Sequence, residues 1–569
     1  MYSDQRRQPI GWIPAGALAL SLLVGCKPAA APSGAPTADA AATVPAEAAD
    51  VAWFEGSVEA AFAAAKAESK PLFLYWGAVW CPPCHYLMTK VFHQPDFVAK
   101  SRDFVAVYLD GDTEGAQTWG ETLNVSGYPT VLVMSPAGEE LLRVPNGLGS
   151  EHYAAVLDRA KAMTQPIDAV LKAVQAAGPA QATPEQLALL AYYDWDLDAR
   201  IKLEDAPKLD LFRRLWAETP AEQEAVKTRF LKLYLTTLHG AREAAAEADP
   251  PTEPPGFADE DRAAVETQIG AFLADPALRN DNLDLLFYWS QETVDLLHPG
   301  LGSQRDTLLR AWADAAKAVE VDESLTVDDR LTALYPQLAM LRMTLPPTPT
   351  PPADAAGGTA TQVAESLPAE LLQHLRDQVA WAGKTVTDPG ELQAVASTMI
   401  WLLDEGGQGE ASQAVLDEAI GRSLAPHYYM SYRASKAKEK GDAAAAVEWS
   451  RKAWVGAEGR ASRFQWGYDH LAMLMSQTPD DAATIEGDTA KVLDELLAND
   501  DAFANRNLAR LKRLQTAIEG WNKDGAHADS AEKIRQQVQV ACERFPAEGE
   551  DSPRDRCLAF LAPAAAPTP

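Results

Sequence analysis

Residues 80–85 read Trp80-Cys81-Pro82-Pro83-Cys84-His85, and this motif is the strongest structural signal in the chain. It follows an apolar run of strand length, Pro71 to Tyr75, and precedes a helical stretch that is interrupted at Pro95. A helix that begins at the Cys-x-x-Cys motif places Cys81 at its N-terminus, where unpaired N–H groups and the helix dipole favour a thiolate. We therefore expect Cys81 to be a nucleophile and Cys84, one turn later, to resolve the mixed disulfide formed on Cys81.

An isolated Cys-x-x-Cys pair can also be half of a zinc site. Zinc needs four ligands, and the sequence shows no second cysteine pair or histidine pair at metal spacing near residues 81–84. His85 and His93 stand alone, so we expect them to be surface residues. We predict neither a metal site nor a bound cofactor.

The segments after the dithiol indicate a mixed α/β unit. Apolar runs of strand length are separated by turn residues, and an amphipathic segment closes the unit. The predicted elements are a strand from Phe104 to Leu109, a strand from Val131 to Met134, a hairpin turn at 136–139, a strand from Leu141 to Val144 and a helix from Ser150 to Met163.

Taken together, residues 51–163 resemble a thioredoxin-fold domain. Within that superfamily they are most similar to the thioredoxin-like C-terminal domain of the membrane thiol:disulfide interchange reductases. The shared features are the Trp-Cys-x-x-Cys motif, Val91-Phe92 with Pro95 after it, and Leu123-Asn124-Val125 followed by Gly127-Tyr128-Pro129-Thr130. The combination of Trp-Cys-x-x-Cys with x-Pro-Thr is far more specific than either motif alone.

The resemblance implies roles for three residues besides the cysteines. Pro129 would have a cis peptide bond beside the dithiol, the backbone of Tyr128 would pair with the substrate, and Trp80 would supply an apolar surface next to Cys81. A cis X-Pro bond costs only about 0.5–1 kcal/mol more than the trans form. For Tyr128 and Trp80, plain packing is an equally good interpretation.

The resemblance also implies an activity, that of a thiol:disulfide oxidoreductase or reductase with protein disulfides as substrates. A reductase outside the cytoplasm would need a separate membrane electron donor. Two residues depart from the family pattern, because Tyr75 and Met88 stand where the family carries acids that help to deprotonate the resolving thiol. Glu55 or Glu59 could replace those acids in space.

The N-terminal residues indicate export and lipidation. Residues 1–25 contain Arg6 and Arg7 and then an apolar run from Ile10 to Val24, which is typical of a secretory signal. Leu23-Val24-Gly25-Cys26 resembles a bacterial lipobox, in which Cys26 is acylated. The alternative is a short uncleaved anchor, and both place the body outside the cytoplasm, in the bacterial cell envelope.

The segment after the lipobox is expected to be a disordered tether. Residues 26–50 are rich in Ala and Pro and contain hardly any large apolar side chain, so they cannot offset the entropy of ordering. By lipobox resemblance, Lys27 favours the periplasmic face of the outer membrane.

Cys542 and Cys557 form a second local cysteine pair, which is typical of an oxidising compartment. A disulfide between them would staple the tail, residues 546–569, with roughly 3 kcal/mol of stabilisation. The alternative is two unpaired thiols.

Length and charge bound the remaining choices. At roughly 150 residues per domain, the chain should contain about three or four folded units. The net charge of −31 repels phosphate backbones, so we expect no nucleic-acid partner.

The fold class is therefore an α/β thioredoxin-like domain, residues 51–165, followed by a large all-α region. Amphipathic segments divided by proline-rich breaks predict helical blocks at 166–247, 259–344 and 361–545. Gly409-Glu410 with Ala414 recurs 32 residues later as Gly441-Asp442 with Ala446, which weakly resembles a tetratricopeptide unit. Ordinary antiparallel helices of a generic all-α scaffold give the same pattern. A helical-repeat region would bind a protein partner, so the alternative function is an adaptor or assembly lipoprotein whose thioredoxin-like domain only binds.

Overall fold

The computed structural model describes residues 50–560, except 126, 146–147, 149, 164, 197, 199–200, 202, 204, 249, 258, 346–366 and 550. The predicted signal, the lipidation site Cys26 and most of the tether lie outside these residues. The chain divides into two compact units. Ala52–Asp110 and Asn124–Leu424 belong to the first unit, and Gly111–Leu123 and the chain from Ala425 onward belong to the second.

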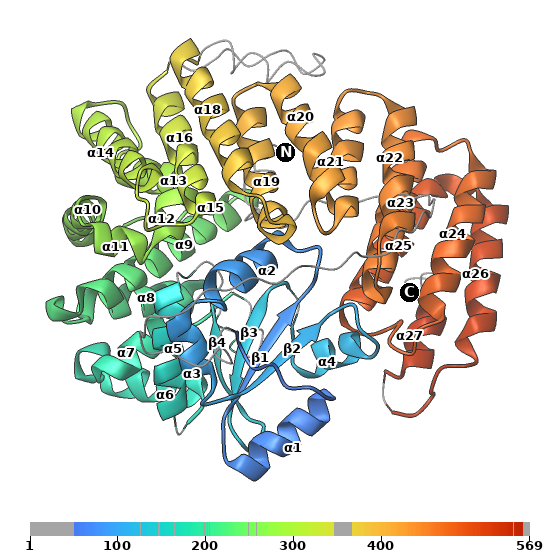
Figure 1. Ribbon diagram of the computed structural model, residues 1–569, viewed down its shortest axis with the longest axis horizontal. Helices are drawn as coiled ribbons and strands as arrows, with labels where there is room; N and C mark the ends of the chain where they lie inside the picture. The colour runs from blue at the N-terminus through green and yellow to red at the C-terminus, as the bar shows by residue number, and fades with distance from the viewer. Residues whose placement is uncertain are drawn as a thin grey trace, which may run out of the picture. The chain divides into compact units, whose positions relative to one another are not determined.

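The first unit contains a four-stranded mixed sheet, with the strands in the order β2-β1-β3-β4 (Figure 1). β1 pairs in parallel with β2, whereas β3 is antiparallel to both β1 and β4. The strands are β1 (Leu72–Gly77), β2 (Val105–Asp110), β3 (Thr130–Met134) and β4 (Glu140–Val144). All four predicted strands are present, and a turn at 136–139 joins the last two as expected.

Every residue of the central strand β1 is buried, because both faces of the sheet are covered. Successive side chains of a strand alternate between faces, so Phe73 and Tyr75 share one face. The Phe73 ring meets Phe92 and Phe97 at centroid distances of 5.8 and 5.7 Å. This aromatic layer holds the segment after the dithiol against the sheet.

The helices that accompany this sheet within the first unit begin where the sequence indicates. Pro95 starts a helix, because its fixed φ and missing N–H suit the first helical turn. The expected helix after the dithiol is accordingly split into an α-helix, a π-helical turn and a second α-helix. These elements are α1 (Val58–Glu68), α2 (Pro82–Tyr86), η1 (Leu87–Val91), α3 (Pro95–Ser101) and α5 (Ser150–Ala162).

The rest of the first unit is helical. No described residue lies in a regular helix between α9, which ends at Glu247, and α10, which begins at Asp259, so the first proline-rich break falls where it was expected. The helices are α6 (Ile167–Ala177), α7 (Pro184–Ala191), α8 (Asp205–Glu218), α9 (Glu224–Glu247), α10 (Asp259–Ala274), α11 (Pro276–Asn280), α12 (Leu283–Tyr288), α13 (Ser290–Leu297), α14 (Ser303–Glu320), α15 (Val327–Thr332), α16 (Leu334–Thr344), α18 (Ala369–Thr385), α19 (Pro389–Glu405) and α20 (Gly409–Arg422).

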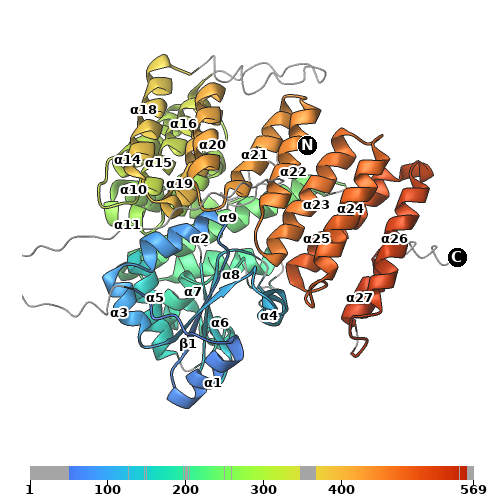
Figure 2. The same cartoon turned by 45° about the vertical axis from the view of Figure 1, so that its right-hand side comes forward.

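The second unit is a set of packed helices, seen side by side from α22 to α26 in Figure 2. From α21 to α24 each helix packs on the next along the chain, whereas α25 packs on α23 and α26 packs on α24. Cys542 and Cys557, both buried, are joined by a disulfide. The helices are α4 (Ala116–Thr122), α21 (Pro426–Glu439), α22 (Ala443–Gly456), α23 (Arg460–Gln477), α24 (Ala482–Leu497), α25 (Asn505–Trp521), α26 (Ala528–Cys542) and α27 (Pro553–Ala559).

The boundary between the units differs from the expected domain limits in two ways. The predicted block 361–545 is divided after Leu424, before Pro426 starts α21. The segment Gly111–Leu123 lies within the predicted domain 51–165 but belongs to the second unit, where Asp112 accepts hydrogen bonds from the amide and hydroxyl of Ser462 at 2.7 and 2.6 Å. Contacts this distant in sequence leave no local signal.

The repeat proposed from the sequence does not align equivalent positions. Ala414 is exposed, whereas Ala446, its expected counterpart 32 residues later, is buried. The buried residues of α20 are Ser412, Leu416 and Ala419, and those of α22 at Ala446, Ser450 and Ala453 follow each of them by 34 positions. The buried positions of α20 and α22 are therefore spaced by the tetratricopeptide period of about 34 residues. The Gly-acid pairs found in the sequence are spaced by 32 residues instead.

Among the described residues, no helix has the length and apolar character needed to cross a bilayer.

Candidate active site

Cys81 lies at the start of α2, as the sequence predicted, and is the N-cap residue of that helix. Its sulfur accepts a hydrogen bond from the backbone N–H of Cys84 at 3.3 Å. Pro82 and Pro83 carry no N–H, so the amide of Cys84 is the first backbone donor of the helix. A donor aimed at the sulfur stabilises a thiolate more than a thiol.

Cys84 lies one turn into the helix and is buried, and no disulfide joins Cys81 and Cys84 in the structure. The hydroxyl of Tyr75 donates to the carbonyl oxygen of Cys84 at 3.3 Å. Burial, together with the two nearby cysteines, raises the pKa of Tyr75 well above its ordinary value. The phenol that replaces the expected acid therefore stays protonated at neutral pH.

The two glutamates considered as substitutes for the missing acid do not fill that position. Glu55 and Glu59 are exposed, whereas the surroundings of Cys84 are buried. A second phenol, Tyr153 from α5, is fully buried and donates to the carbonyl of Pro145 at 3.2 Å. Burial is the main cause that raises the pKa of Tyr153, and the charges of Asp194 and Cys84 add to it.

The peptide bond between Tyr128 and Pro129 is cis. The ring of Tyr128 stacks on Trp76 with a centroid distance of 5.4 Å and meets Trp80 edge-on at 5.5 Å. Trp80 precedes Cys81 in the chain, so these ring contacts bring the bend at Pro129 to the dithiol. Trp80 is buried and Tyr128 is half-buried.

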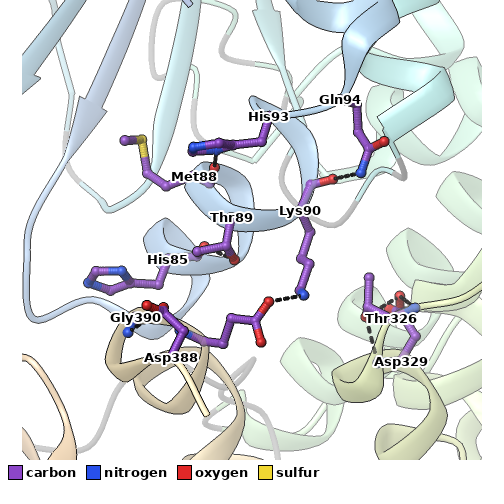
Figure 3. A network of polar contacts seen from close by, with 11 residues as sticks. His85, Met88, Thr89, Lys90, His93, Gln94, Thr326, Asp329, Asp388 and Gly390 are labelled. Carbon is purple, nitrogen blue, oxygen red and sulfur yellow. Dashed lines mark hydrogen bonds and ion pairs between the residues drawn. The ribbon is translucent and has the colours of Figure 1, made fainter. Parts of the chain in front are cut away.

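The helical region of the same unit contacts the dithiol segment directly. The side-chain amide of Gln393, in α19, donates to the carbonyl oxygen of Trp80 at 2.8 Å. Lys90, in η1, forms an ion pair with Glu391 of α19, drawn in Figure 3. These contacts join the start of α2 and the turn after it to one end of α19.

His85, expected at the surface, is half-buried where α19 approaches α2. Its Nε2 lies 2.5 Å from the carbonyl oxygen of Val79. A Cβ atom on Gly390 would lie 3.4 Å from Nδ1 of His85, so the glycine permits this close approach. Burial lowers the pKa of His85, while the Val79 carbonyl and Asp388 act in the opposite direction.

His93, the other histidine considered as a ligand, is exposed and hydrogen-bonds the carbonyl oxygen of Met88 (Figure 3). Within the ranges that the structure describes, no group of three or more His, Cys, Asp or Glu side chains could hold a metal ion.

An acidic pair in α15 lies on another side of the dithiol helix. The hydroxyl of Tyr86, in α2, donates to Asp329 at 3.5 Å, and Thr398 donates to Asp328 at 2.8 Å. Burial and the neighbouring Asp329 raise the pKa of Asp328 to about 7.

Sequence reasoning found the dithiol and the cis-proline bend but missed the contribution of α19. Gln393 and Trp80 are 313 positions apart, and the residues around Gln393 form no recognisable motif. The only local signal is Asp388-Pro389, which is typical of a helix start and says nothing of what that helix contacts.

Comparison with known proteins agrees with this geometry. Residues 58–161 match the family model described as a thioredoxin-like domain. The match covers the sheet strands, the dithiol and the cis-proline bend, and it leaves out the helical region. A search of curated proteins found no match to the chain.

Proposed function

We propose that this chain, in which residues 58–161 form a thioredoxin-like domain, is a thiol:disulfide oxidoreductase that acts on disulfides of other proteins. Cys81 is the attacking residue and Cys84 the resolving residue. The resemblance to interchange reductases favours reduction of the substrate. The observation that carries the proposal is the Cys84 amide, which donates to the sulfur of Cys81 at the first turn of α2.

The exchange begins when the Cys81 thiolate attacks one sulfur of the substrate disulfide. The substrate S–S bond breaks, a mixed disulfide forms on Cys81, and the leaving thiolate takes a proton from water. Cys84 then loses its proton to water and attacks the sulfur of Cys81, which releases the second substrate thiolate for protonation. The substrate gains two electrons and two protons, and Cys81 and Cys84 are left as a disulfide.

A second dithiol protein must then reduce the Cys81–Cys84 disulfide by the same exchange in reverse. In the cell envelope this donor would be a separate membrane protein, since the oxidising compartment supplies no thiols of its own. The proposed lipid anchor at Cys26 would hold the protein at the membrane surface. The local cysteine pair at 542 and 557, joined as a disulfide, supports an extracytoplasmic location.

Turnover of a protein disulfide by the full-length protein, with a small dithiol as electron source, tests the proposal. Cys81→Ser should abolish turnover, because serine cannot form the mixed disulfide. Cys84→Ala should stop the reaction at the mixed disulfide, which non-reducing gel electrophoresis and mass spectrometry would identify and which would name the natural partner. The double variant Cys542→Ser/Cys557→Ser is the matched control and should keep turnover.

Turnover that survives Cys81→Ser would exclude the proposed nucleophile. A parent protein without any turnover would contradict the enzymatic proposal and would favour an adaptor that uses its thioredoxin-like domain for binding alone.

A further inference from the structure

The peptide bond between Trp80 and Cys81 is held at both ends. Its N–H, that of Cys81, donates to the carbonyl oxygen of Ala78 at 3.1 Å. Its carbonyl oxygen, that of Trp80, accepts the 2.8 Å hydrogen bond from Gln393. Hydrogen bonds at both ends oppose rotation of this planar peptide, and its orientation sets the direction in which the backbone enters Cys81.

The direction of the Cys81 side chain depends on the backbone conformation of that residue. Cys81 has φ −83° and ψ 113°, the extended geometry of an N-cap residue, and only there does its side chain turn back toward the amides of the first turn. The hydrogen bond from the Cys84 amide to the sulfur is the result. Rotation of the Trp80–Cys81 peptide would move the sulfur away from this donor.

Gln393 is placed firmly enough to hold the peptide. Its side chain is fully enclosed, at 0% exposure, so leaving its buried donor unsatisfied would be costly. One turn earlier, Asp388 caps α19 by accepting from the amides of Gly390 and Glu391 at 2.9 and 3.0 Å. Figure 3 shows this helix end lying under the turn that carries Lys90, which pairs with Glu391.

We propose that Gln393 is a positioning residue of the dithiol: its carboxamide holds the Trp80–Cys81 peptide so that the sulfur of Cys81 faces the amide of Cys84. The inference rests on the proposed function, because positioning of Cys81 matters only if Cys81 is the nucleophile. It makes Gln393, in the helical region, part of the redox site. Gln393 does not touch the reacting sulfur in this role. It acts through the backbone.

The test measures the acidity of Cys81 in the full chain, in a Cys84→Ala background that leaves one reactive thiol in the motif. The rate of alkylation by iodoacetamide is followed against pH, and mass spectrometry identifies Cys81 as the modified residue. Gln393→Met keeps the length of the side chain but removes its donor. We expect the pKa of Cys81 to rise by about one unit, which lowers the thiolate fraction below that pKa about tenfold.

Gln337→Met is the matched control, because Gln337 is another buried glutamine of the same unit, bonded to Glu320 at 2.7 Å. It should lower the melting temperature in the same way and leave the pKa of Cys81 unchanged. An unchanged pKa in Gln393→Met, or an equal rise in Gln337→Met, would overturn the inference.

A second variant covers the case in which Gln393→Met does not fold. Gln393→Asn keeps the carboxamide but is one methylene shorter, which withdraws its donor from the carbonyl oxygen of Trp80 without changing any charge. A rise in the pKa of Cys81 is expected here too, and no rise would contradict the inference. Turnover of the parent protein is measured separately. A parent without turnover would contradict the proposed enzymatic function, whereas the titration of Cys81 would still decide whether Gln393 positions it.

Discussion

Tyr75 changes how a proton can leave Cys84. A general base must be deprotonated near the working pH, and the pKa of Tyr75 lies far above it because the phenol is buried beside two thiols. The hydroxyl instead donates to the Cys84 carbonyl. In the proposed exchange, water or the substrate therefore accepts the proton when Cys84 attacks.

The variant Tyr75→Phe tests this role. It keeps the ring that contacts Phe92 at 5.0 Å and Tyr108 at 5.2 Å and removes only the hydroxyl. We expect a loss of about 1 kcal/mol in the free energy of unfolding, the value of one hydrogen bond. The pH profile of turnover should keep its shape between roughly pH 6 and 9, since a protonated phenol is no base there. Loss of one limb of that profile in the variant would show that Tyr75 does accept the proton.

His427, in α21 of the second unit, should make stability depend on pH. It is buried, its ring meets Trp466 at 4.9 Å, and burial lowers its pKa to about 4. Between about pH 6.5 and pH 4 the histidine is protonated in the unfolded chain but stays neutral in the native protein. The free energy of unfolding therefore falls as the pH drops through this range. The loss attributable to this group is at most roughly 3–4 kcal/mol, since the pKa shift is about 2.5 units and each unit corresponds to about 1.4 kcal/mol.

The variant His427→Gln removes the titrating group. Urea unfolding at pH 7, 5.5 and 4.5, followed by tryptophan fluorescence, should give a smaller loss of stability for the variant than for the parent. His470 also has a pKa lowered by burial, so part of the slope should remain in both proteins. Identical slopes in the two proteins would mean that His427 does not titrate as described.

At the scale of elements, the packing of α23 against α24 depends on one glycine. A Cβ atom on Gly467 would lie 2.8 Å from both methyl groups of Val492, and Val492 is fully buried. Gly487, in α24, is exposed, and a Cβ atom added to it would meet no other part of the chain within 4 Å.

These two glycines form a matched pair for substitution. Gly467→Ala should destabilise the second unit by about 1–3 kcal/mol, because an enclosed site cannot accept an added methyl group. Gly487→Ala should stabilise it by about 0.5–1 kcal/mol, because alanine favours an exposed helix interior. Thermal unfolding of both variants measures the difference, and a stabilising Gly467→Ala would show that the two helices can move apart.

Local elements could be predicted from the sequence and distant contacts could not. The strand, the dithiol and the start of α2 follow from adjacent residues, and the bend at Pro129 follows from a motif. His85 could not be placed, because its burial depends on Gly390 and on the path of α19. Gln393 could not be found at all, since a single glutamine carries no chemical signature of what it faces.

At the scale of the whole molecule, a residue from within the thioredoxin-like sequence caps a helix of the second unit. This residue is Asp112, and the helix is α23. Gly459, the N-cap residue of α23, has no side chain to bond the first amides of that helix. Asp112 takes this role through the amide and hydroxyl of Ser462. Nearby, Asp501 accepts the amide of Gln117 at 3.3 Å.

The variant Asp112→Ala should therefore destabilise the second unit, although residue 112 lies between two strands of the sheet. The expected cost is about 1–2 kcal/mol, the usual loss for an N-cap acceptor. Asp103→Ala, which removes an exposed ion pair with Lys161, is the control and should change the unfolding free energy by less than about 0.5 kcal/mol. Hydrogen exchange of the first-turn amides of α23 would locate the effect, and unchanged protection there would contradict it.

The placement of Gly111–Leu123 limits how this protein could have been assembled from older parts. Ala116 and Gln117 are buried in the full chain, and the amide of Gln117 is bonded to Asp501. A gene fragment ending near codon 165 would encode a domain in which these side chains are exposed to solvent. Exchange of that fragment for one without an acid at position 112 would also remove the acceptor for the first turn of α23. The two halves are therefore expected to be inherited together, and swaps between relatives should succeed only when the breakpoints keep the loop with its helices.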